Sequence, residues 1–185
     1  MHFTALLSLY AKEHPDHLRQ SLASLAAQTQ PAAEILIVLD GAITPALEAV
    51  LAEFVGRLPL NIIRLPKNVG LGRALNHGVQ HARHEWIFRM DTDDIAAPTR
   101  FADQCAYLAA HPQTALLGGQ IAEFANTPGQ SHASRQVPQT QPEIPFQAET
   151  FAKPAICGAS VARRCCQPIK PCWITIWQRA VAAPF

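Results

Sequence analysis

The segment Trp86-Ile87-Phe88-Arg89-Met90-Asp91-Thr92-Asp93-Asp94 joins an apolar run to three closely spaced carboxylates. The apolar run is typical of a buried strand, and the acidic residues follow its end. Carboxylates at this spacing repel one another, so a fold tolerates them where a cation binds. Oxygen ligands favour Mg²⁺ or Mn²⁺, whose open positions bind substrate phosphates. The segment therefore predicts a metal-assisted site for a phosphorylated ligand. The alternative is that Asp93 or Asp94 caps a helix entering at Pro98.

Patterns typical of strands and helices alternate through the first 125 residues. Continuous apolar runs indicate strands covered on both faces, and apolar residues spaced by three and four indicate helices. The expected strands are residues 3–9, 35–39, 60–65 and 86–90, and the expected helices lie near 18–25, 45–54, 74–79 and 101–108. A further strand is expected within 115–124. This alternation predicts an α/β fold, a Rossmann-like, mostly parallel sheet flanked by helices.

Polar residues follow three of the expected strands. Ser8 and Tyr10 come after the first, Asp40 after the second, and Asp91 opens the acidic run after the fourth. Ligands of open α/β sheets bind at the carboxyl ends of the strands. A helix cap explains only the last of these groups, so their convergence favours a ligand site on one rim of the sheet.

Length and composition limit the classes of protein that the chain can be. Its 185 residues predict one domain, and 49% hydrophobic with 16% charged residues is typical of a soluble globular protein. A net charge of +1 gives no electrostatic reason to expect nucleic acid as a partner. No apolar run is long enough to predict a transmembrane helix, so the cytoplasm is the expected compartment.

Five segments, in this order, resemble family 2 glycosyltransferases, the inverting nucleotide-sugar enzymes with a GT-A fold. The resemblance covers residues 6–124 and is strongest for bacterial enzymes that build lipopolysaccharide, capsule or exopolysaccharide. It is carried by Leu7-Ser8-Leu9-Tyr10, by Ser24-Leu25-Ala26-Ala27-Gln28-Thr29, by residues 34–40, by residues 68–76 and by Asp91-Thr92-Asp93-Asp94.

The resemblance implies a transferase that moves a sugar from a nucleotide-diphosphate sugar to a saccharide or lipid-linked acceptor, with Mn²⁺ or Mg²⁺ as cofactor. It is also compatible with peripheral association at the inner face of a membrane. The implied metal ligands are Asp91 and Asp93. The implied nucleotide-sugar contacts are Ser8, Tyr10, Asp40, Asn68, Arg73 and Asp91.

Several of these residues also have structural interpretations. Tyr10 is also compatible with packing at a strand end, Asn68 with capping the helix after Gly70, and Arg73 with a solvated helix surface. Glu13, in the first loop, is expected to be solvated.

The composition changes along the second half of the chain. We expect a nucleotide-sugar-binding core over residues 1–125, a loop and the start of the acceptor side over 126–153, and an atypical tail over 154–185. No Asp or Glu follows Glu149, so the catalytic base that the family places in this half has no counterpart there. This predicts a frameshifted or truncated gene, and the alternative is a divergent but genuine C-terminus. Two alternatives to a transferase stay open: an inactive nucleotide-sugar-binding remnant and a metal-dependent, phosphatase-like hydrolase.

Overall fold

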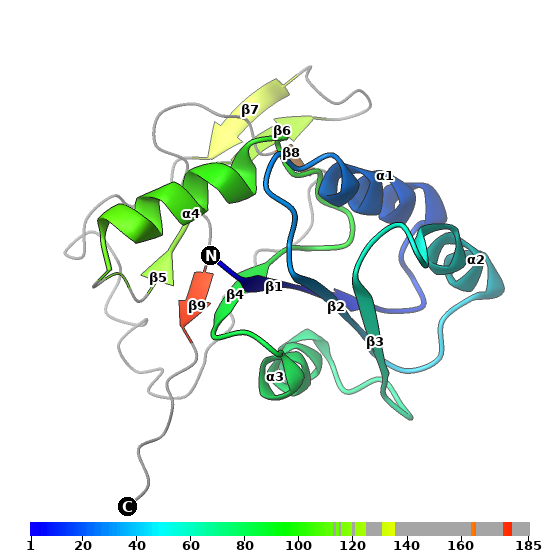
Figure 1. Cartoon of the computed structure of the whole chain (residues 1–185). Coiled ribbons are helices and arrows are strands. Elements are labelled where there is room, and N and C mark those ends of the chain that lie inside the picture. The colour runs from blue at the N-terminus through cyan, green and yellow to red at the C-terminus, as the bar shows by residue number, and fades with distance from the viewer. Residues whose placement is uncertain are drawn as a thin grey trace, which may run out of the picture.

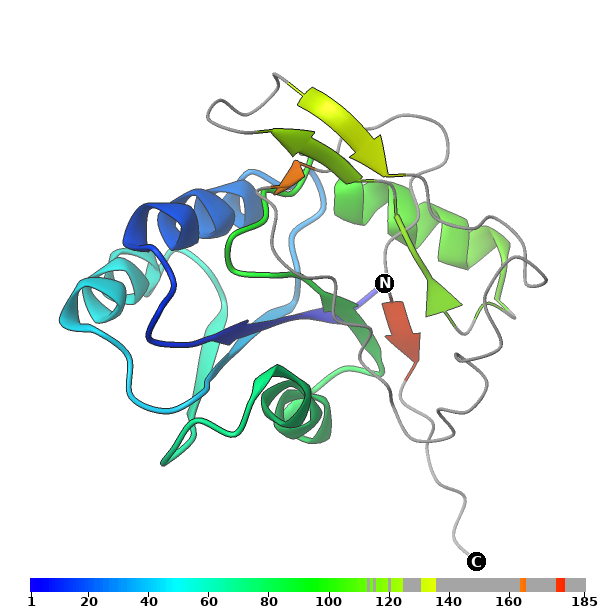
Figure 2. The same ribbon diagram turned by 180° about the vertical axis from the view of Figure 1, so that it is seen from behind.

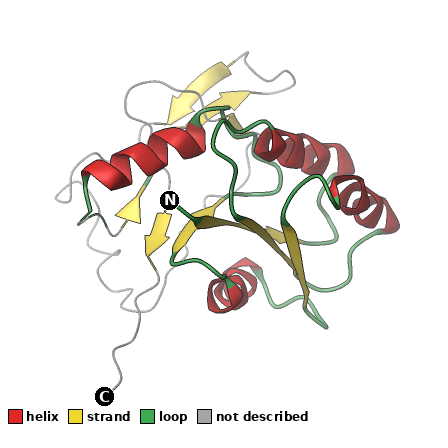
Figure 3. Ribbon diagram, in the orientation of Figure 1, coloured by secondary structure: helices red, strands yellow, loops and turns green. Residues whose placement is uncertain are grey.

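Strands and helices alternate regularly over the first 110 residues of the computed structural model, which describes residues 1–112, 114, 116–119, 121–124, 131–135, 164–165 and 176–178 (Figure 3). The elements are β1 Phe3–Leu9, α1 Pro15–Ala26, β2 Glu34–Leu39, α2 Pro45–Phe54, β3 Leu60–Arg64, α3 Leu71–His81, β4 Trp86–Arg89 and α4 Arg100–Ala110. The predicted alternation is confirmed, with boundaries within a few residues of those expected.

The main sheet has the strand order β3-β2-β1-β4-β9-β5, where β5 is Leu116–Leu117 and β9 is Ile176–Gln178 (Figure 1). Strands β1 to β4 are parallel, and β9 runs antiparallel between β4 and β5. Because β2 and β4 lie on opposite sides of β1, the chain leaves β1 and β4 in different directions. This switch of direction opens a crevice at the carboxyl ends of the strands, the usual ligand site of such sheets.

Three more strands form a second, antiparallel sheet in the order β7-β6-β8. They are β6 Ile121–Phe124, β7 Ser131–Arg135 and β8 Arg164–Cys165. The loop expected at the start of the 126–153 region is therefore wrong for β7, whose Ser-His-Ala-Ser-Arg sequence lacks an apolar pattern. Its backbone pairs with β6, and backbone pairing of this kind cannot be detected from the pattern of side chains. The remainder of the 126–153 region and most of the tail lie outside the described residues.

Helices cover both faces of the main sheet. Figures 1 and 2 show α1, α2 and α4 on one face and α3 on the other. Alternate residues of β1 enter the two cores: Leu7 and Leu9 pack with the three-helix side, whereas Leu6 packs with α3. Among the described helices, none is both long and apolar enough to cross a membrane.

Two helix boundaries explain how the sequence sets the loops of the site. Helix α2 begins as predicted, because the Thr44 hydroxyl accepts from the Leu47 N–H at 3.3 Å and Pro45 fills the first helical position. Helix α4 begins at Arg100. The side chain of Thr99, its N-cap residue, makes no capping hydrogen bond. The acidic run lies well before this start, so the interpretation of Asp93 or Asp94 as a helix cap is wrong.

Candidate functional site

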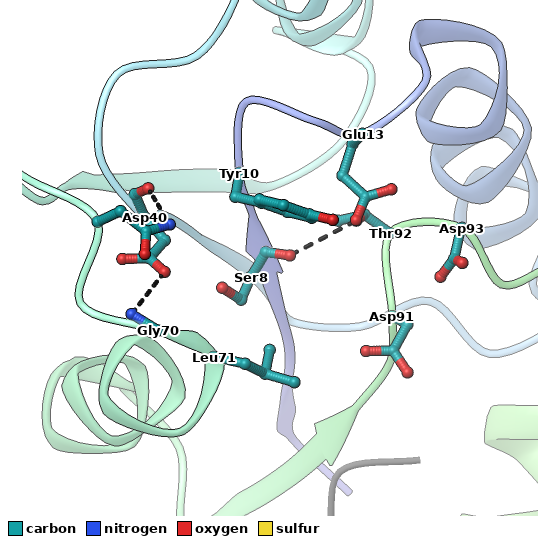
Figure 4. A pocket seen from close by; sticks show the side chains of 10 residues that line it. Ser8, Tyr10, Glu13, Asp40, Gly70, Leu71, Asp91, Thr92 and Asp93 are labelled. Atoms are coloured by element: carbon teal, nitrogen blue, oxygen red, sulfur yellow. Dashed lines mark hydrogen bonds between the residues drawn. The ribbon is translucent and has the colours of Figure 1, made fainter. Parts of the chain in front are cut away.

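The carboxyl ends of β1, β2 and β4 and the start of α3 surround a pocket of about 320 Å³ (Figure 4). Its walls come from segments that are far apart in the sequence. The lining residues are Ser8, Tyr10, Glu13, Asp40, Asn68, Gly70, Leu71, Asp91, Thr92 and Asp93. The structure thus brings together all of the residues proposed from the sequence except Arg73, which lies on the exposed surface of α3.

Asp40 organises the wall of the pocket before α3. Its side chain is only 3% exposed, and its two carboxylate oxygens accept from Val69 N–H at 2.6 Å and Gly70 N–H at 3.0 Å. The Asn68 amide donates to the Asp40 carbonyl at 3.2 Å. Asn68 therefore ties the loop before α3 to the end of β2. It does not cap α3, because the N-cap residue of this helix is Gly70 and no side chain caps it. A direct contact between Asp40 and a nucleotide base stays a prediction.

Gly41 allows the loop after β2 to approach the loop before α3 closely. Its φ of +87° lies in the left-handed region, and a Cβ there would lie 2.7 Å from the Asn68 backbone nitrogen. Among the glycines that the structure describes, only Gly41 combines this backbone conformation with so little space. The glycine therefore has a packing role in the same wall.

Two apolar side chains line the mouth of the pocket. Tyr10 and Leu71 are each 40% exposed. Figure 4 shows them on either side of Ser8, with the Tyr10 ring lying above the strand end. An aromatic ring facing an open pocket can stack on a planar ligand group. The exposure of Tyr10 leaves its ring free for such a contact, and the choice between ligand contact and packing at the strand end stays a prediction.

The opposite wall is acidic. Asp91 forms an ion pair with Arg89, and the Arg100 guanidinium in turn donates to the Arg89 carbonyl at 2.9 Å. Thr92 is buried, and its hydroxyl donates to the Ser8 carbonyl at 3.5 Å, which links the acidic run to the end of β1. The pairing of Asp91 with Arg89 could not be foreseen from a pattern of carboxylates alone.

Glu13 adds a third carboxylate to this wall and is partly buried rather than solvated. Burial, and then the charges of Asp93 and Asp91, raise the pKa of Glu13 to about 7. Burial is the larger cause, and the nearby carboxylates add to it.

These acidic side chains fit a divalent ion that arrives with its ligand. Among the described residues, no three Asp, Glu, His or Cys side chains form a complete metal cage. Mg²⁺ sites of phosphate-handling enzymes use one or two carboxylates and complete the coordination with substrate phosphates and water. Asp93, with Asp91 beside it, supplies such a donor set, and hard oxygen ligands suit Mn²⁺ equally well.

A mostly parallel sheet with a polar, acidic pocket at its switch point has the architecture of ligand-binding α/β proteins. A more specific assignment comes from comparison with known families. The family described as "Glycosyl transferase family 2" matches residues 8–164 of this chain. The chain belongs to this family, which confirms the resemblance found in its motifs. The match ends within the segment that composition marks as atypical.

Known proteins agree with this assignment. The chain is 50% identical over 144 residues to an uncharacterized glycosyltransferase of Haemophilus influenzae, covering 78% of this chain and 54% of the relative. It is 47% identical over 122 residues to the amylovoran biosynthesis glycosyltransferase AmsE of Erwinia amylovora, covering 66% and 46%. The chain therefore spans about half the length of these curated relatives.

A solved structure supports the fold. The crystal structure of TarS from S. aureus superposes with a TM-score of 0.58 at 25% sequence identity, over 75% of this chain and 23% of TarS. The predicted GT-A architecture is confirmed by this similarity and by the family match.

Proposed function

We propose that this protein takes part in bacterial surface polysaccharide synthesis, by transferring a sugar from a nucleotide-diphosphate sugar to a saccharide or lipid-linked acceptor. Membership of family 2 supports the reaction class. The name of the Erwinia relative, an amylovoran biosynthesis glycosyltransferase, supports the polysaccharide context. Peripheral association with a membrane is part of the same proposal.

The observation that carries the proposal is the pairing of two different walls in one pocket. One wall, built by Asp40 and Asn68, presents backbone and amide groups beside the exposed Tyr10 ring. The other presents the carboxylates of Asp91 and Asp93. A nucleoside diphosphate has a planar base at one end and a charged diphosphate at the other. The first wall suits the base, and the acidic wall would bind the diphosphate through a divalent cation.

Each residue then has a distinct role in donor binding. Tyr10 stacks on or lines the base, and Asp40, which also holds the loop before α3, accepts from a base N–H. Asp93, with Asp91, holds Mn²⁺ or Mg²⁺, which stabilises negative charge on the departing diphosphate when bound. Arg73, on the exposed surface of α3, is proposed to lie against the diphosphate. Ser8 contributes a polar strand end between the two walls.

The group that activates the acceptor hydroxyl is not assigned to any residue of this chain. Positioned bases typically contribute about 10²–10⁴ in rate, so binding and transfer need separate measurements. The family match gives no support to a phosphatase-like hydrolase or to an inactive remnant. If the chain binds donor without turnover, the remnant interpretation regains support.

The test is thermal unfolding of the 185-residue chain with a panel of UDP- and GDP-sugars, each with Mn²⁺ and with EDTA. We expect at least one nucleotide sugar to raise the melting temperature in a metal-dependent way, because ligands that bind only the folded state stabilise it. Sugar phosphates without a nucleotide serve as the control. Stabilisation by sugar phosphates but by no nucleotide sugar would contradict the proposal and favour a hydrolase.

A further inference from the structure

The acidic loop, residues 91–99 between β4 and α4, carries both proposed metal ligands but is neither helix nor strand over most of its length. Its own backbone contributes a hydrogen bond from Asp94 N–H to Asp91 O at 3.3 Å, and Arg100 N–H donates to Ala97 O at 3.0 Å. Carboxylates on an irregular segment point correctly only when a supporting shell holds the backbone. The partners of this loop therefore decide how well the acidic wall is formed.

Gln28, just after the end of α1, is the most fully engaged of these partners. Its side-chain amide donates to the Ala97 carbonyl at 2.7 Å and to the Ser24 carbonyl at 3.2 Å, and its amide oxygen accepts from Phe101 N–H at 3.1 Å. The residue is only 8% exposed. A buried amide with both ends occupied has one orientation, so Gln28 links the end of the acidic loop to the first turn of α4.

Two serines of α1 bond to the same loop. The Ser24 hydroxyl accepts from Ala96 N–H at 3.0 Å while it donates to the Ser21 carbonyl at 2.7 Å. The Ser21 hydroxyl donates to the Asp91 carbonyl at 3.4 Å. Side chains of α1 thus reach the loop at its first residue and again near its middle.

The loop is held at its far end as well. The Thr29 N–H and hydroxyl both donate to the Pro98 carbonyl, at 2.9 and 3.2 Å. We refer to Ser21, Ser24, Gln28 and Thr29 together as the α1 clamp.

The spacing of the clamp explains its reach. Ser21, Ser24 and Gln28 follow one another at i, i+3 and i+7, which places them along one side of the helix and its extension. They contact the loop in the same order, from Asp91 at its start to Phe101 beyond its end. The helix thus runs alongside the loop and bonds to it at several points.

We propose that Gln28, assisted by Ser24, is a positioning residue that holds the acidic loop so that Asp91 and Asp93 face the pocket. Neither residue lines the pocket, so we expect a ligand bound there to touch neither side chain. The motif Ser24-Leu25-Ala26-Ala27-Gln28-Thr29 thereby gains a structural role, because it supports the metal ligands from behind. The link to metal rests on the proposed function, whereas the link to loop position does not.

The loop position is tested first, without any ligand. Hydrogen exchange of the 185-residue chain is compared with that of Gln28→Ala, and Gln20→Ala serves as the matched control because Gln20 lies on the exposed face of the same helix. We expect amides of residues 94–101 to exchange about tenfold faster or more in Gln28→Ala, with β2 and α2 unchanged, because local openings are independent of global unfolding. Unchanged exchange in this loop, or equally faster exchange everywhere, would overturn the proposal.

Metal binding is tested second, with Mn²⁺ plus UDP and Mn²⁺ plus GDP as probes. Loss of residues that orient metal ligands typically weakens metal affinity about 10–100-fold. We expect Gln28→Ala and Ser24→Ala to weaken Mn²⁺ binding in the presence of the nucleotide, but to leave nucleotide binding in EDTA unchanged. Ser24→Thr, which keeps the hydroxyl, should restore most of the loss.

The outcomes separate the two proposals. If the parent chain binds neither Mn²⁺–nucleotide probe, the proposed function is wrong, and hydrogen exchange alone decides whether the clamp positions the loop. If the parent binds but the variants lose metal-dependent and metal-free binding equally, the clamp only stabilises the fold and the positioning role is refuted. Failure of Ser24→Thr to bind better than Ser24→Ala would also count against it.

Discussion

Asp40 offers the sharpest test of how the pocket is built, because the sequence and the structure suggest different roles for it. By family resemblance its carboxylate receives a hydrogen bond from the base of the nucleotide. In the structure both carboxylate oxygens already accept backbone N–H groups, those of Val69 and Gly70. A residue that serves only the ligand can be replaced without harm to the free protein, whereas a residue that holds a loop cannot.

The cost of Asp40→Ala follows from these bonds. Hydrogen bonds to a charged group contribute roughly 1.5–3 kcal/mol each, which gives an upper range of about 3–6 kcal/mol for two. The Val69 and Gly70 N–H groups are only partly buried and regain water in the variant, and the desolvation cost of the carboxylate disappears. We therefore expect Asp40→Ala to lower the free energy of unfolding by about 2–4 kcal/mol. Asp40→Asn should cost less, because its amide oxygen still accepts one of the two N–H groups.

The assay is urea unfolding of the chain without nucleotide, followed by circular dichroism. Asp103→Asn is the control, since Asp103 is an exposed carboxylate on α4 and its replacement should change stability by no more than about 0.5–1 kcal/mol. If Asp40→Ala unfolds at the same urea concentration as the parent but fails to bind nucleotide, the structural role argued here is refuted and the base-binding role stands alone.

Three other changes test the remaining parts of the site and fold. Asp93→Ala should abolish the Mn²⁺-dependent part of nucleotide-sugar binding, because it removes an oxygen ligand, and should not lower thermal stability, because it relieves like-charge repulsion. If the variant binds as tightly as the parent with Mn²⁺ present, Asp93 is not the metal ligand. Gly41→Ala should destabilise the chain by about 1–3 kcal/mol more than Gly56→Ala, because both glycines have positive φ but only Gly41 of the two lacks space for a Cβ. Equal midpoints of urea unfolding for the two variants would contradict this prediction. Glu34→Gln should lower the free energy of unfolding by about 1–3 kcal/mol at neutral pH, and this difference from the parent should shrink in acid, where the carboxylate is protonated. A difference that does not change with pH would show that the charge of Glu34 is not the cause.

The pH dependence at Glu34 has a definite sign. Burial alone would raise its pKa, but hydrogen bonds from the Arg83 N–H, Asn61 and Thr4, with the Arg83 charge, outweigh burial and hold the pKa below its usual range. A carboxyl whose folded pKa is lowered stabilises the protein fully above the unfolded value of about 4.3 and loses that contribution as the pH falls through the folded value. The carboxylate joins the starts of β1, β2 and β3, far from the pocket, so this effect concerns stability alone.

The fold was largely predictable because its signals are local. The run Ile35-Leu36-Ile37-Val38-Leu39 is apolar throughout, and a strand buried on both faces needs such a run. The Thr44-Pro45 pair marks a helix start through its own side chain and ring. By contrast, β7 was missed because a polar strand stabilised by pairing has no periodicity to detect.

The site was predictable in its residue types but not in its hydrogen bonds. Strand-end polar residues could be assigned to one rim because parallel strands share a carboxyl edge. The pairing of Asp91 with Arg89 and the bonds of Asp40 depend on side-chain direction at that edge, which a sequence pattern leaves open. Asn68 shows the difference: its position before α3 suggested a cap, and only the structure shows that its amide reaches the end of β2.

Both walls of the pocket follow the same structural logic. In each, a side chain from a regular element or its end bonds to the backbone of a neighbouring irregular loop: Asp40 holds the loop before α3, and Gln28 holds the acidic loop. The strands and one face of α1 are buried, so these regular elements give each loop a fixed support. This arrangement holds the loop before α3 and the acidic loop on two sides of one pocket, as the proposed base and metal sites require. Substitutions behind the pocket should therefore affect donor binding as much as substitutions inside it.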